Sequence, residues 1–83
     1  GDEDQSLTRL YERITSQRPN DSRLRLLRQT LAAFRDLYAA DQTLAAAVTP
    51  DMADADHKQR AEAAAWTMMA HSLLNLELAK VKR

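Results

Sequence analysis

The sequence contains no cysteine, and its only glycine is Gly1. Without cysteine, the chain cannot form a disulfide, ligate an iron–sulfur cluster, build a thiolate zinc site or attach a c-type haem. Without further glycines, it cannot build the positive-φ turns of a phosphate-binding loop, a Rossmann turn or a nucleophile elbow. We therefore expect no enzyme activity, no cofactor and no small-molecule substrate.

A net excess of either charge is also missing, because 12 basic residues balance 12 acidic ones. Such a chain has no overall field that would attract nucleic acid or a membrane surface. Its 83 residues form one domain near the lower size limit for independent folding. Stability must therefore come from packing, either within the chain or against a partner.

The beginning of the chain suggests a fragment. It opens Gly-Asp-Glu-Asp without an initiator methionine, and Gly1 is typical of a residue left by cleavage. We expect residues 1–3 to be a disordered N-terminus. Residues 4–83 are expected to form a single helical domain excised from a larger parent protein.

Apolar residues recur at helical spacing through the first half of the chain. One stripe predicts a helix over residues 4–17, ended by Arg18-Pro19; it consists of Leu7, Leu10, Tyr11 and Ile14. A second stripe predicts a helix that is capped by Asn20 or Asp21 and ends near Ala40. Its members are Leu24, Leu27, Leu31, Phe34, Leu37 and Tyr38.

Two alternatives remain open after Ala40. Asp41 caps a short helix whose inward residues are Leu44, Ala45 and Val48, or the second helix continues with a kink. Thr49-Pro50 ends either version, because proline cannot continue a helix. Residues 49–57 then form an acidic loop.

The last helix is predicted over residues 57–80, with Asp56 as its cap. Asp56 with Arg60, and Lys58 with Glu62, are i,i+4 pairs that would support it. The whole chain is therefore predicted to be all-α, a small bundle of three long helices and one short helix.

Residues 63–75, AAAWTMMAHSLLN, are almost free of charge although 29% of the chain is charged. The stretch is too short for a membrane span, which needs about 20 apolar residues. Its polar residues form a thin line four residues apart, which we call the polar line: Thr67, His71 and Asn75. We expect these side chains to hydrogen-bond to neighbouring backbone. Because the rest of the circumference is apolar, the last helix should be the central element, buried on several sides.

Two companion helices cannot cover such a helix completely, so part of it should meet a partner. We define the predicted docking surface as four residues of this helix, Trp66, Met69, Leu73 and Leu76. The expected partner is another domain of the parent protein or a second copy of the chain, in a homo-oligomer.

Residues 64–77, AAWTMMAHSLLNLE, resemble the closing "ELAAWT…LLNLDE" helix of a known family. That family is the C-terminal domain of unknown function in large planctomycete cell-surface proteins, which often also carry a planctomycete cytochrome c-like module. The similarity extends over residues 7–80 and includes Arg18, Pro19, Asn20 and Leu24, and the aromatic–Ala–Asp step at 38–41. The resemblance implies a non-catalytic packing module of an exported cell-envelope protein, and any haem would belong to a separate cysteine-bearing module.

Two places in the sequence carry residue types that can bind a metal. Asp51, Asp54, Asp56 and His57 lie within seven residues, but the loop lacks the glycine of a calcium-binding loop, so we expect no metal there. His71 has no second ligand at helical spacing.

Residues 9–35 are net basic, because they contain Arg9, Arg13, Arg18, Arg23, Arg25, Arg28 and Arg35. These arginines could contact phosphates or pair with the acidic residues of the 51–56 loop. Nucleic-acid binding is therefore the alternative function, although their spacing does not hold one face and we do not expect nucleic acid as a partner.

Overall fold

A computed structural model describes residues 2–81 of the chain, with side chains through Ala79. Four α-helices follow one another: α1 (Asp2–Thr15), α2 (Asp21–Ala40), α3 (Gln42–Val48) and α4 (His57–Val81). A 3₁₀ turn, η1 (Pro50–Met52), lies between α3 and α4, and no strand occurs among the described residues. The predicted all-α helical bundle is confirmed.

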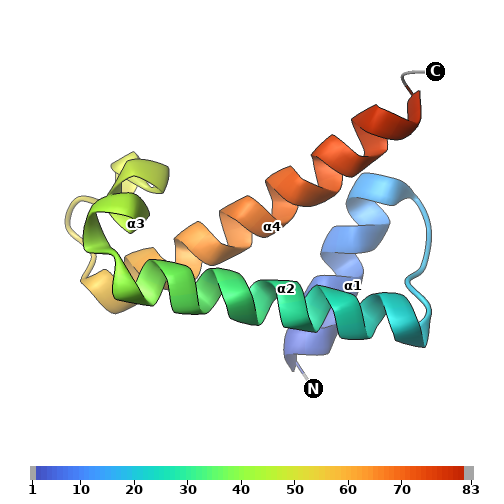
Figure 1. Ribbon diagram of the computed structural model, residues 1–83, viewed down its shortest axis with the longest axis horizontal. Helices are drawn as coiled ribbons and strands as arrows, with labels where there is room; N and C mark the ends of the chain where they lie inside the picture. The colour runs from blue at the N-terminus through green and yellow to red at the C-terminus, as the bar shows by residue number, and fades with distance from the viewer. Residues whose placement is uncertain (1, 82–83) are drawn as a thin grey trace.

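The last helix, α4, packs against α1, α2 and α3. Figure 1 shows that α4 meets the end of α2 beside α3 and then diverges from α2 towards its own C-terminus. We call the point of closest approach the α2–α4 junction. The first helix, α1, occupies the space where α2 and α4 are farther apart (Figure 1).

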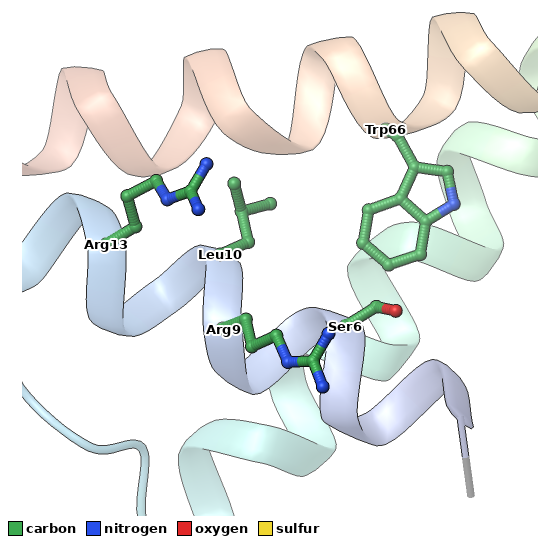
Figure 2. Close-up of a pocket in the computed structure, with 5 residues that line it drawn as sticks. All are labelled: Ser6, Arg9, Leu10, Arg13 and Trp66. Carbon is green, nitrogen blue, oxygen red and sulfur yellow. The ribbon is translucent and has the colours of Figure 1, made fainter.

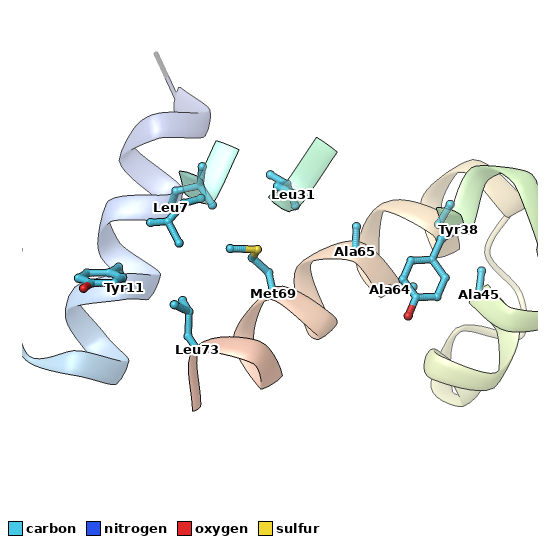
Figure 3. Close-up of a cluster of buried hydrophobic side chains, with 11 residues drawn as sticks. Leu7, Tyr11, Leu31, Tyr38, Ala45, Ala64, Ala65, Met69 and Leu73 are labelled. Atoms are coloured by element: carbon cyan, nitrogen blue, oxygen red, sulfur yellow. The ribbon is translucent and has the colours of Figure 1, made fainter. Parts of the chain in front are cut away.

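The side chains that α4 contributes to the core change in size as the distance between α2 and α4 grows. The buried residues of the core are Leu7, Tyr11, Leu27, Leu31, Tyr38, Ala45, Ala61, Ala64, Ala65, Met69 and Leu73. Figure 3 shows the small Ala64 beside Tyr38 and Ala45, whereas the larger Met69 and Leu73 face Leu7 and Tyr11 of α1. Along α4, small side chains therefore lie near the α2–α4 junction, and larger ones face α1.

The buried face of α4 turns along its length. Ala61 and Leu73 are both buried, yet they are twelve residues apart, which corresponds to a rotation of about 120° on an ideal helix. The first half of α4 faces α2 and α3, and the second half faces α1. This rotation explains why residues 63–75 are apolar on several sides.

Three predicted side-chain caps are present. Asn20 Oδ1 accepts a hydrogen bond from Arg23 N at 2.7 Å, and Asp56 Oδ1 accepts one from Gln59 N at 2.8 Å. Asp41 Oδ1 accepts from Leu44 N at 3.0 Å. The backbone of Asp41 is extended (φ −133°, ψ 96°), so α3 is a separate helix and the kinked continuation of α2 is wrong.

The bounds of the first helix differ from the prediction. Asp2 and Glu3, which were expected in a disordered N-terminus, belong to the first turn of α1, while Gly1 lies outside the described residues. The helix ends at Thr15 rather than at Gln17, because Ser16 adopts the left-handed conformation with φ 60°. A left-handed residue at this position ends many helices.

Two leucines predicted to face the core do not. Leu37 is 47% exposed and Leu44 is 38% exposed. Each is next to a buried residue, Tyr38 and Ala45 respectively, and adjacent residues on a helix point about 100° apart. In each pair of neighbours, one residue faces the core and the leucine beside it faces solvent.

We predict that Ser16→Gly stabilises the protein by roughly 0.5–1 kcal/mol, because glycine adopts positive φ without a Cβ clash. The matched control is Ser72→Gly on the exposed side of α4, which should cost about 0.5 kcal/mol through lower helix propensity. Urea denaturation followed by circular dichroism measures both. A destabilising Ser16→Gly would contradict the left-handed backbone at this position.

Candidate functional site

The predicted docking surface divides into core and surface residues. Met69 is 1% exposed and Leu73 is 5% exposed, because α1 covers this side of α4 (Figure 3). Their assignment to a surface for a partner is therefore wrong. Trp66 is half-buried against the core and Leu76 is 43% exposed, so these two remain accessible.

Arg35 of α2 links three helices near the α2–α4 junction. Its Nε donates to Glu62 Oε2 at 2.9 Å and to Oε1 at 3.0 Å, and its Nη2 also donates to Oε1. Its Nη1 pairs with Glu3 in the first turn of α1. One guanidinium therefore fixes α1, α2 and α4 relative to one another.

Trp66 belongs to the same network. Its indole Nε1 donates to Glu62 Oε1 at 3.2 Å, one helical turn away. Donation from the Arg35 guanidinium, and to a smaller degree from Trp66, holds the pKa of Glu62 below its usual value, although partial burial acts in the opposite direction. The two carboxylates in turn raise the pKa of Arg35, with Glu62 as the larger cause.

Other arginines pair with acids of this chain rather than with the 51–56 loop. Arg28 Nη1 lies 2.9 Å from Asp4 Oδ2, and Arg18 Nε lies 3.6 Å from Glu12 Oε2. Both pairs are solvent-exposed to a large degree, so each contributes at most about 1 kcal/mol. The first turn of α1 is thus held to α2 through Asp4 as well as Glu3.

The start of α4 is anchored to the end of α3. Arg60 Nε donates to the hydroxyl of Thr49 at 3.2 Å, and its Nη2 donates to the carbonyls of Thr49 and Ala46. Thr49 is 6% exposed, and its hydroxyl donates to Ala45 O at 2.8 Å. Arg60 thus satisfies carbonyls at the C-terminal end of α3, where a cation is favoured, rather than serving as the predicted partner of Asp56.

The polar line faces outwards. Thr67 Oγ1 donates to Ala63 O at 2.8 Å, as expected for a polar residue on a helix. His71 and Asn75 are exposed, so water rather than neighbouring backbone is positioned to satisfy them. This face of α4 is therefore exposed at His71 and Asn75 and partly covered at Thr67.

Three leucines near the end of α4 are exposed: Leu74 by 49%, Leu76 by 43% and Leu78 by 55%. We call them the C-terminal leucines. Leu74 and Leu78 are one turn apart and share a face, whereas Leu76 lies on another. Only Leu76 was predicted as surface. Leu74 follows the buried Leu73, so its exposure depends on how α1 crosses α4.

The described residues do not gather into a metal site. No group of three or more His, Cys, Asp or Glu side chains could hold an ion within residues 2–81. In the acidic segment, Asp56 caps α4 and His57 Nε2 lies 2.9 Å from Ala39 O. No helix in this part of the chain has the length and apolar character to cross a membrane.

We predict that Met69→Ala lowers the free energy of unfolding by about 2–5 kcal/mol, because it leaves a cavity beneath α1. Leu76→Ala, at an exposed position of the same helix, should change it by less than about 0.5 kcal/mol. Chemical denaturation distinguishes them. Equal effects of the two substitutions would contradict the division of the predicted docking surface into core and surface.

We predict that Glu62 makes the free energy of unfolding depend on pH in the acidic range. Because the pKa of folded Glu62 is lowered, its contribution is complete above the unfolded value of about 4.3 and is lost as pH falls through the folded pKa. Below about pH 4.3, wild type should therefore lose stability more steeply than Glu62→Gln. Glu12→Gln, which removes a carboxylate from an exposed pair, is the control and should follow wild type more closely in thermal denaturation at several pH values.

Comparison of the chain with protein-family models, with curated proteins and with solved structures finds no match.

Proposed function

We propose that the chain is a non-catalytic helical packing module from the C-terminal end of a large planctomycete protein exported to the cell envelope. The resemblance of residues 64–77 supports the planctomycete origin and the envelope location. The observation that carries the packing role is the exposure of Leu74 and Leu78 on one side of α4 near its C-terminus.

Isolated exposed leucines are common on soluble proteins and need no explanation. Leu74 and Leu78 differ because they lie one turn apart on the same side of α4 as the exposed His71. An apolar cluster with a polar border is typical of a surface that contacts another protein. Burying these side chains would compensate for the small core of the domain itself.

The occupant of this surface is another domain of the parent protein. In the isolated chain at high concentration, the C-terminal leucines of a second copy take its place, because the same apolar surface is then the most abundant one available.

The arrangement of the arginines does not favour the alternative of nucleic-acid binding. Arg18, Arg28 and Arg35 pair with carboxylates of this chain. Arg23 and Arg25 are two residues apart on α2 and leave it on nearly opposite sides. A phosphate-binding surface needs several cations that face the same way. In the described part of the chain, however, the unpaired arginines of residues 9–35 are one pair on α1, Arg9 and Arg13, and the divergent Arg23 and Arg25.

We predict that the isolated chain self-associates as its concentration rises and that Leu74→Gln/Leu78→Gln shifts it to the monomer. The substitution removes apolar surface with little change in helix propensity. Sedimentation velocity over a concentration series measures the state of association.

The matched control is Leu26→Gln/Leu37→Gln on α2, where the two leucines are 49% and 47% exposed. It should associate as wild type does. A wild-type chain that remains monomeric at about millimolar concentration and melts well above the ~45–65 °C of ordinary mesophile domains would contradict the packing role.

A further inference from the structure

An open groove of about 480 Å³ lies between α1 and α4, on a surface separate from the C-terminal leucines. It is lined by Ser6, Arg9, Leu10, Arg13 and Trp66 (Figure 2). Trp66 extends from α4 towards α1, while Leu10 and Arg13 extend from α1 towards α4. Its volume falls within the roughly 300–1,000 Å³ of sites that hold a side chain or a small ligand.

The cations of this groove are available to a partner. Within residues 2–81, the structure pairs neither Arg9 nor Arg13 with a carboxylate, and both are exposed. Asp4 and Glu12 line a neighbouring hollow with Arg9, but they pair with Arg28 and Arg18. Glu3, Asp4 and Glu12 of α1 are thus engaged by arginines outside the groove.

The spacing of these cations is defined by the helix. Arg9 and Arg13 are four residues apart on α1, so their Cα atoms are about 6 Å apart along its axis. Two carboxylates with a similar separation can each accept hydrogen bonds from one guanidinium. Glutamates four residues apart on a partner helix provide this separation.

An apolar surface lies beside the charges, with Leu10 next to Arg13 and Trp66 at the other end of the groove (Figure 2). Leu10 and Trp66 are half-buried, pack against the core and leave part of their surface in the groove. The hydrogen bond from Trp66 Nε1 to Glu62 fixes the orientation of the indole, so the surface is formed before a partner arrives. A bulky apolar side chain placed between two carboxylates would contact both Leu10 and Trp66.

We propose that the groove binds an acidic peptide segment in which a leucine or an aromatic residue lies between two carboxylates about one helical turn apart. This interaction goes beyond the packing role of the C-terminal leucines, because it uses different residues and a partner of defined charge. Either interaction can fail in experiment without the other.

Trp66 is the only tryptophan of the chain, so its fluorescence reports directly on the groove. The probe is a capped helical peptide without tryptophan or tyrosine that has two glutamates four residues apart and a leucine between them. Addition of this peptide should change Trp66 emission saturably, and higher salt should weaken the binding. A peptide with glutamines in place of the glutamates should bind about tenfold more weakly or not at all.

The variant that tests the cations is Arg9→Gln/Arg13→Gln, with Arg23→Gln/Arg25→Gln as a control that loses the same charge outside the groove. The first should weaken binding of the acidic peptide about tenfold, and the second should change it less than twofold. Circular dichroism verifies that both variants fold. Equal binding by the two variants, or no change in Trp66 emission at millimolar peptide, would overturn the proposal, whereas the association measured with Leu74→Gln/Leu78→Gln would be unaffected.

Discussion

The arrangement of this protein depends on three small buried side chains at the start of α4. Ala64 and Ala65 lie where α4 meets α2 and α3, and Ala61 lies beside α2. Because alanine fills little volume, the backbones approach closely at this point. Farther along α4, Met69 and Leu73 fill a wider space. The gradient in side-chain size along α4 thus matches the divergence of the helices, and the divergence makes room for α1.

The polar contacts reinforce this packing at its edge. The pairing of Arg35 with Glu62 is partly exposed, so its contribution to stability is modest. Its bidentate geometry matters more, because it fixes the rotation of α4 about its axis relative to α2. Glu62 also holds the Trp66 indole, so the junction and the groove between α1 and α4 share one carboxylate.

Features that depend on neighbouring residues could be predicted from the sequence. The caps Asn20, Asp41 and Asp56 act on backbone amides three residues away, and apolar spacing was sufficient to identify the helices. The end of α1 was placed two residues late because the left-handed conformation of Ser16 has no signature without glycine. Local patterns were therefore enough for the elements but not for every boundary.

Features that depend on how helices cross could not be predicted in the same way. Leu73 and Leu74 are adjacent and chemically identical, yet one is buried and the other is 49% exposed. The path of α1 across α4 decides between them. Arg35 and Glu62 are 27 positions apart, so their pairing also follows from the tertiary fold.

The alanines at the junction have a mechanical consequence. Alanine has no side-chain rotamers to rearrange, so a larger residue at position 64 cannot be absorbed by a change of conformation and must push the two backbones apart. The junction then acts as a pivot and α4 as a lever arm, because its far end lies many residues away. If the two backbones moved apart at the pivot by the width of one methyl group, the shift would be larger at Leu78. The distance between α1 and the C-terminal half of α4 would then change.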